Sequence, residues 1–204
     1  MPVIILGLTG LIGSGKSSAA ITFRSLGCGI VDGDAISRAL TAQNGAALPA
    51  LREAFGDGMF DEKGCLLRKK LGSLVFRNAE ELGKLNRIMQ PLILEEIHRR
   101  IREMAEQGPD ICVLDMPLLF EENLDRLCDV TVCVTMPEEE RLRRIMQRDG
   151  CTREEALSRS RSMWSQEKKA ERADHVLDNG GTPEELDRQV LQLFSALKKG
   201  SRHV

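Results

Sequence analysis

The sequence GLIGSGKS, from Gly10 to Ser17, holds the residues of this chain whose spacing most clearly suggests chemistry. It fits the pattern G-x-x-x-x-G-K-[ST], in which glycines allow backbone N–H groups to surround phosphate oxygens. The lysine supplies a mobile positive charge to the outer phosphates, and the serine hydroxyl can ligate Mg²⁺. A helix that begins near Gly15 would point its positive dipole end at the same anion. The spacing therefore predicts a nucleotide-binding phosphate loop (P-loop).

The context of the loop supports this interpretation. An apolar run, Val3–Leu8, precedes it and the helix-like stretch Ser17–Leu26 follows, so the glycines lie between a strand and a helix. The alternative is a glycine-rich turn that binds nothing. That alternative is disfavoured, since a chance match in a chain of 204 residues is roughly a one-in-a-hundred event. The residues expected to bind ATP here are Gly10, Ile12, Gly13, Ser14, Gly15, Lys16 and Ser17.

Carboxylates that follow predicted strands are candidates for the remaining chemistry. Asp34 follows the strand predicted over Gly27–Val31, where a carboxylate can orient an acceptor hydroxyl and take its proton. Asp32 is the competing choice, and either aspartate could instead stabilise a turn. Asp115 follows the apolar run Ile111–Leu114 and could either help to hold Mg²⁺ or cap a loop.

A cluster of arginines lies later in the chain. Arg141, Arg144 and Arg148 are three and four residues apart and so share one face of a predicted helix. Such a helix is ordinarily a solvated face, here close to Glu138–Glu140. Behind a P-loop, however, the stripe can close over the transferring phosphoryl group and neutralise its developing charge, a role we expect of Arg144 and Arg148. The cationic region is extended by Arg153, Arg159 and Arg161.

Short apolar strands alternate with helices along the chain. Besides the two strands already named, the pattern predicts strands over Ile111–Leu114, Val130–Val134 and His175–Leu177. Helical spacing is strongest over Ala79–Glu106, which Pro91 either kinks or divides into two helices. Strands separated by helices indicate an α/β fold with a parallel sheet of about five strands, flanked by helices and with ligands at its carboxyl edge. Capping boxes are predicted at Thr152 and Thr182.

Length and amino-acid composition exclude several classes of protein. A chain of 204 residues fits one compact α/β domain, and a net charge of −2 creates no global attraction to nucleic acid or to an anionic membrane. No run of 18 apolar residues occurs, so no membrane span is predicted. The six cysteines show no C-x-x-C pair, which favours a reduced, cytoplasmic chain. Tyrosine is absent and tryptophan single, which argues against an aromatic platform for nucleic acid.

Five motifs, in order, resemble those of the dephospho-CoA kinase family. Outside the P-loop each motif is weak alone, but together they are specific and cover nearly the whole chain. The motifs are G-L-T-G-L-I-G-S-G-K-S (Gly7–Ser17), V-D-G-D (Val31–Asp34), P-L-L-F-E (Pro117–Glu121), R-x-x-R-x-x-x-R (Arg141–Arg148) and A-D-H-V-L-D-N-G-G (Ala173–Gly181).

The resemblance implies a P-loop kinase of the nucleoside-monophosphate-kinase type that uses ATP and Mg²⁺ to phosphorylate the ribose 3′-hydroxyl of dephospho-CoA. It implies a core over residues 1–34, 108–137 and 170–204, a helical acceptor-binding excursion over 35–107 and a lid over 138–169. Arg144 would act from the lid, and Asn179 would approach the adenine of ATP. The metal ligands would be Ser17 and Asp115. The acceptor would be bound by Thr9, Asp34, Gln90, Pro117, Leu118 and Glu121.

Two residues depart from the pattern of the family. Leu11 stands where glycine is usual, so its backbone must lie at negative φ or be strained. Gln90 stands where histidine is common, and an amide can hydrogen-bond an acceptor but cannot carry charge.

Two rival functions stay open on the residues alone. Another small-molecule kinase, such as a nucleotide or shikimate kinase, fits equally well because acceptor choice depends on contacts in the excursion. A nucleotide-dependent switch that binds a protein is disfavoured because no N-K-x-D motif occurs, and Asp61–Gly64, which matches D-x-x-G, is interpreted as a turn. We expect a monomer or a small homo-oligomer.

Overall fold

A computed structural model describes residues 3–75, 77–106, 108–161 and 163–200 of the chain. Two compact units are present: unit 1 comprises Met1–Val31 and Glu103–Val204, and unit 2 comprises Asp32–Arg102. Gln107, the predicted end of the acceptor-binding excursion, lies outside the described residues, as does the predicted core segment 201–204.

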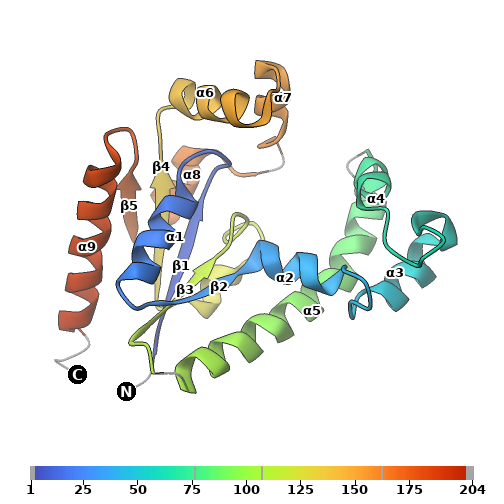
Figure 1. The fold of residues 1–204 in the computed structure, drawn as a ribbon, viewed down its shortest axis with the longest axis horizontal. Helices are drawn as coiled ribbons and strands as arrows, with labels where there is room; N and C mark the ends of the chain where they lie inside the picture. The colour runs from blue at the N-terminus through green and yellow to red at the C-terminus, as the bar shows by residue number, and fades with distance from the viewer. Residues whose placement is uncertain (1–2, 76, 107, 162, 201–204) are drawn as a thin grey trace. The chain divides into compact units, whose positions relative to one another are not determined.

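A five-stranded parallel sheet forms the centre of unit 1, which confirms the predicted fold class (Figure 1). The strands follow the order β2–β3–β1–β4–β5 across the sheet. The apolar residues of the inner strands β3 and β4 are buried on both sides, because helices cover both faces of such a sheet, whereas Val176 on the edge strand β5 is exposed. The strands are β1 (Ile4–Gly10), β2 (Gly29–Asp32), β3 (Ile111–Asp115), β4 (Val130–Thr135) and β5 (His175–Asp178).

The register of the sheet brings several strand ends to one edge. Leu8 of β1 is paired with Asp115, the last residue of β3. Gly10, the last residue of β1, is paired with Val134 of β4. Thr135 is in turn paired with Asp178, the last residue of β5. The loops that follow these strands therefore leave from the same edge, where doubly wound sheets bind their ligands.

Helices cover the two faces of the sheet in unit 1. Helices α1 and α9 pack on one face, and α8 contacts β1 and β4 on the other (Figure 1). Phe23 of α1 and Val190 of α9 share one core with Leu8 and Val132 of the sheet. The unit-1 helices are α1 (Lys16–Ser25), the short 3-10 helix η2 (Leu124–Leu127), α6 (Glu138–Asp149), α7 (Arg153–Ser158), α8 (Gln166–Arg172) and α9 (Pro183–Gly200).

Local sequence signals explain where several helices begin. Thr152 and Glu155 form the predicted capping box at the start of α7. Thr182 and Glu185 exchange the same pair of hydrogen bonds at the start of α9. Both capping predictions are therefore confirmed. None of the helices in the described residues combines the length and the apolar character needed to cross a membrane.

Unit 2 is helical and has its own core. Leu51 and Met89 are buried there among partly buried leucine, isoleucine and phenylalanine side chains. Helix α5 continues through Pro91, so the proline does not divide it into two helices. The Asp61 carboxylate accepts hydrogen bonds from the backbone N–H groups of Lys63 and Cys65, which confirms the predicted turn. The elements are α2 (Gly33–Leu40), α3 (Leu48–Phe55), the 3-10 helix η1 (Asp57–Met59), α4 (Arg68–Val75) and α5 (Ala79–Glu106), whose last residues belong to unit 1.

Candidate functional site

The P-loop connects β1 to α1 as predicted. Strand β1 ends at Gly10 and α1 begins at Lys16. Gly13 and Gly15 adopt φ values of 84° and 92°, a backbone conformation that a residue with a Cβ adopts only with strain. Leu11 lies at negative φ, because Asn44 and Asn123 are the non-glycine residues with positive φ in the described chain. Leucine at position 11, where the family usually has glycine, therefore causes no strain in the backbone of the loop.

The P-loop presents several unused hydrogen-bond donors. Across the described residues, no protein acceptor receives the backbone N–H groups of Gly13, Gly15, Lys16 and Ser17. No side chain caps the N-terminus of α1, and the buried hydroxyl of Ser14 has no partner either. A bound anion satisfies such donors at a helix N-terminus, and the helix dipole favours it further. These residues therefore fit the phosphate groups of a nucleotide.

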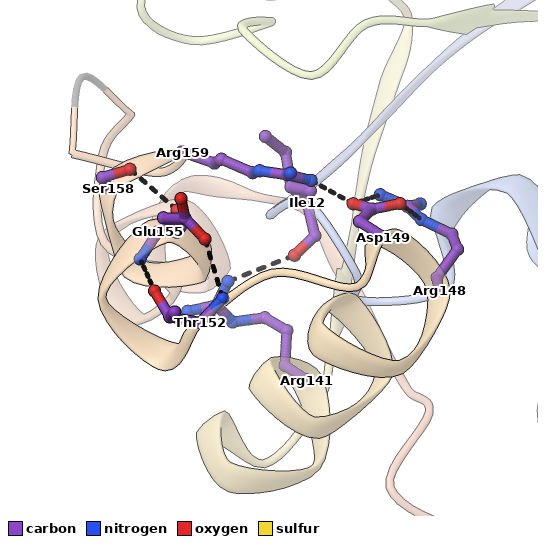
Figure 2. A network of polar contacts seen from close by, with 8 residues as sticks. All are labelled: Ile12, Arg141, Arg148, Asp149, Thr152, Glu155, Ser158 and Arg159. Carbon is purple, nitrogen blue, oxygen red and sulfur yellow. Dashed lines mark hydrogen bonds and ion pairs between the residues drawn. The ribbon is translucent and has the colours of Figure 1, made fainter.

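Two side chains from the later part of the chain hold the outer side of this loop. Arg141 of α6 donates a hydrogen bond from Nη1 to the carbonyl oxygen of Ile12, at 3.1 Å (Figure 2). Asn179, which directly follows β5, donates from Nδ2 to the carbonyl oxygen of Ser14, at 2.8 Å. Arg141 and Asn179 are 3% and 4% exposed, so water competes little for either bond.

These two bonds set the direction of the backbone N–H groups that follow. No described peptide bond is cis, and in a planar trans peptide the N–H points away from the carbonyl of the same unit. The hydrogen bond from Arg141 therefore turns the Gly13 N–H to the opposite side of the loop. The bond from Asn179 turns the Gly15 N–H in the same way. The P-loop is thus held with these donors facing away from α6 and the β5 loop.

No local sequence pattern predicts this arrangement. Spacing groups Arg141 with the other arginines on one helix face, and the family resemblance places Asn179 near the adenine of ATP. The two bonds join residues 129 and 165 positions apart, and no local pattern reports such contacts. Burial lowers the pKa of the Arg141 guanidinium, so Arg141 does not belong to a solvated arginine face.

Lys16 forms an ion pair with Asp115 at the end of β3. Both side chains are largely buried, with 13% and 11% of their surface exposed. The register of β1 and β3 explains the contact, because the P-loop begins two residues after the position paired with Asp115. The structure therefore brings the predicted phosphate-binding lysine together with the predicted metal carboxylate.

The residues near the P-loop also fit a Mg²⁺ ion that is held mainly by phosphates and water. Ser17 and Asp115 offer oxygen ligands, and Mg²⁺ commonly takes one or two protein ligands in nucleotide sites. No group of three or more His, Cys, Asp or Glu side chains that could hold a metal ion occurs in the described part of the chain.

The outer arginines of α6 are paired with neighbouring carboxylates. Arg143 and then Arg144 hydrogen-bond to Glu140 and hold the pKa of its carboxyl at about 2. Arg148 donates to both oxygens of Asp149, with distances of 2.7 and 2.9 Å (Figure 2). The side chains of Arg144 and Arg148 remain 40% and 62% exposed. They would therefore have to exchange partners in order to reach a phosphate.

Carboxylates of α6 also tie this helix to α7 and the residues after it. Arg159 pairs with Asp149, and Arg153 donates to both oxygens of Glu139. The acidic neighbours expected for a solvated arginine helix are therefore present, and they join the two halves of the predicted lid. Arg161 is exposed.

The segment after β3 carries the predicted acceptor residues of unit 1. Pro117 and Leu118 are half-buried, whereas Thr9 on the adjacent strand has no exposed surface. Thr9 Oγ1 donates to the carbonyl oxygen of Pro117 at 3.0 Å. Glu121 accepts hydrogen bonds from the Trp164 backbone N–H and from Lys169 Nζ. Thr9 and Glu121 are therefore engaged within the protein, and both contact Lys169, which no sequence motif singles out.

In unit 2 the two competing aspartates have different surroundings. Asp32 is the N-cap of α2, and its Oδ1 accepts the Ala35 N–H at 2.8 Å. Its Oδ2 lies 3.7 Å from Arg38 Nη2. Asp34 is exposed in the first turn of α2 and has no hydrogen bond or ion pair to the described residues. Gln90 of α5 is also exposed. Of the two aspartates, it is therefore Asp32 that stabilises the turn.

Alanine substitution at two glycines tests how closely Asn179 packs on the P-loop. A Cβ on Gly15 would overlap Asn179 Nδ2, whereas a Cβ on Gly27, at φ 87°, would meet no atom within 4 Å. Both substitutions should cost about 1–2 kcal/mol of backbone strain. Only Gly15→Ala should also weaken ATP binding, by about tenfold or more, because it displaces Asn179. Calorimetric ATP titration and urea unfolding measure the two effects, and equal ATP affinity in both variants would contradict this packing.

Comparison with known proteins gives a consistent result. A family model described as dephospho-CoA kinase matches residues 4–185. The dephospho-CoA kinase of Carboxydothermus hydrogenoformans is 41% identical over 194 residues, which cover 95% of this chain and 94% of that protein. The dephospho-CoA kinase of Geobacillus kaustophilus is 38% identical over 199 residues, which cover 96% of this chain and 99% of that protein.

Solved structures agree. A crystal structure of a protein from Thermus thermophilus has a TM-score of 0.84 and 35% identity, covering 97% of this chain and 99% of that one. The dephospho-CoA kinase of Campylobacter jejuni has a TM-score of 0.71 and 25% identity, and the match covers 97% of this chain and 98% of that one. A shikimate kinase from Acinetobacter baumannii shares the fold alone. Its TM-score is 0.51 at 16% identity, and the match covers 96% of this chain and 95% of that one. The chain is a P-loop kinase by fold, and it belongs to the dephospho-CoA kinase family.

Proposed function

We propose that this protein transfers the terminal phosphoryl group of ATP to the ribose 3′-hydroxyl of dephospho-CoA, giving coenzyme A and ADP. The observation that carries the proposal is the family match over residues 4–185, which includes every residue placed at the site above. The unused N–H donors of the P-loop support it independently, because they fit the triphosphate of the phosphoryl donor.

The P-loop is proposed to bind the ATP phosphates through its backbone and through Lys16. The N–H groups of Gly13, Gly15, Lys16 and Ser17 would donate to the phosphate oxygens, and Lys16 would leave Asp115 for the outer phosphates. Ser17 and Asp115 would hold Mg²⁺, which supplies charge neutralisation to the phosphates when bound. Arg144 and Arg148 would neutralise the charge that develops during transfer.

Unit 2 and the segment after β3 are proposed to bind the acceptor. The exposed carboxylate of Asp34 would orient the ribose hydroxyl and accept its proton. Gln90 would hydrogen-bond the acceptor, and Pro117 and Leu118 would contact it through their exposed surface. Thr9 and Glu121 would act on the acceptor through the segment that they hold. Residues 35–107 would form the acceptor-binding part and residues 138–169 the lid, whose closure excludes water.

We also propose a cytoplasmic protein that acts as a monomer or a small homo-oligomer. The six cysteines are free thiols, as in a reducing compartment. The rival assignments are less favoured. The likeness to shikimate kinase concerns the fold alone. A protein-binding switch is disfavoured because the sequence has no N-K-x-D motif.

An acceptor panel tests the reaction directly. Formation of ADP from ATP is measured with dephospho-CoA, shikimate, AMP or no acceptor. We expect dephospho-CoA to raise the rate by about 100-fold or more over the rate without acceptor, because positioning a hydroxyl accelerates transfer far beyond hydrolysis. Preference for another acceptor, or a slow rate that no acceptor changes, would support the corresponding rival.

Paired asparagine variants test the base. Asparagine is as good an N-cap as aspartate, so Asp32→Asn should keep both the stability and the turnover of the wild type. Asp34→Asn should lower kcat by about 10²–10⁴-fold with unchanged stability, because an amide cannot accept the hydroxyl proton. Steady-state kinetics and urea unfolding of both variants make the comparison. The reverse pattern would make Asp32 the base.

A further inference from the structure

A buried lysine joins three separate segments on the α8 side of the sheet. Lys169 has no exposed surface, although it lies on a helix of mostly exposed, charged residues. Its Nζ lies 2.8 Å from Glu121 Oε2 and 2.8 Å from the carbonyl oxygen of Pro117. It also lies 3.5 Å from Thr9 Oγ1. One ammonium group thus contacts β1 and both ends of the segment Pro117–Glu121.

The carbonyl of Pro117 is fixed by two donors. Thr9 Oγ1 donates to it at 3.0 Å, in addition to the bond from Lys169. A carbonyl oxygen has two lone pairs, so both of its acceptor positions are used. The Thr9 hydroxyl proton is committed to this bond, and Thr9 is fully buried. The start of the segment is therefore held to the end of β1, directly before the P-loop.

Glu121 holds the other end of the segment to the chain that precedes α8. Its Oε1 accepts the Trp164 backbone N–H at 2.7 Å, while its Oε2 pairs with Lys169. The Trp164 ring stacks on Phe120, with 6.2 Å between the ring centroids. Both oxygens of Glu121 are thus occupied, and an aromatic contact reinforces the attachment.

Stability alone does not explain a buried ion pair. Removing two charges from water costs several kcal/mol per ion, and well-packed apolar residues in their place are often equally stable or more stable. The pair does fix geometry, because each oxygen and each N–H needs its partner in one place. We propose that Lys169 is a positioning residue, which holds Pro117–Glu121 in one conformation so that the exposed surface of Pro117 and Leu118 meets the acceptor. This inference rests on the proposed function.

A double-mutant cycle tests the proposal. Lys169→Met removes the cation and leaves the buried carboxylate of Glu121 without its positive partner. Glu121→Gln removes the negative charge, and the double variant removes both charges. We expect each of the three variants to raise KM for dephospho-CoA about tenfold or more, with KM for ATP within about twofold of the wild type. The effects should be non-additive, because the two residues act as one unit. The exposed Lys199 of α9, changed to Met, is the matched control and should keep both KM values.

The stability of the same variants separates positioning from a structural role. Urea unfolding should show a large loss for Lys169→Met and a recovery in the double variant, while KM for dephospho-CoA stays raised. A double variant with wild-type KM would overturn the proposal, as would multiplicative effects or an equal rise in KM for ATP. If Lys169→Met does not fold, the double variant decides the question alone.

Fluorescence gives a readout that does not depend on the acceptor. Trp164 is the only tryptophan in the chain, and its backbone is bound to Glu121. The emission maximum of Lys169→Met should shift to longer wavelength as the ring loses its packing on Phe120; unchanged emission would contradict the role of Lys169 in fixing this segment. If the wild type does not phosphorylate dephospho-CoA, the proposed function fails, but this shift still shows whether Lys169 holds the segment.

Discussion

The site depends on two hydrogen bonds that hold the P-loop from outside. A loop that binds phosphates through its backbone must turn N–H groups inward, and its carbonyls then face outward and need donors of their own. Arg141 and Asn179 supply those donors to Ile12 and Ser14. The P-loop is therefore preorganised by residues that lie more than a hundred positions later in the chain.

The rest of unit 1 brings these donors to the loop. The parallel register places the ends of β1, β4 and β5 side by side, so that α6 and the loop after β5 both reach the P-loop. Close packing requires glycine at the contacts: a Cβ on Gly13 would lie 2.8 Å from Ile145 Cγ1, and one on Gly15 would overlap Asn179. The glycines thus serve the approach of α6 and Asn179 as well as that of a phosphate.

Local patterns in the sequence predicted the strands, the capping boxes and the P-loop, because each of these depends on residues close together in the chain. They could not predict contacts set by tertiary packing. Lys169, within QEKKAER, resembles an exposed lysine, and only the fold shows that it is buried. The helix continues through Pro91 because buried or partly buried Met89 and Leu92 lie on either side of it, so burial offsets the lost hydrogen bond.

The affinity of the Arg141→Leu, Asn179→Ala double variant for ATP tests the outside support of the P-loop most directly. Arg143→Leu, on the exposed face of the same helix, is the control. Two lost hydrogen bonds of about 1 kcal/mol each predict calorimetric binding weaker by about tenfold or more, with the circular dichroism of the wild type. Wild-type affinity in the folded double variant would contradict the account.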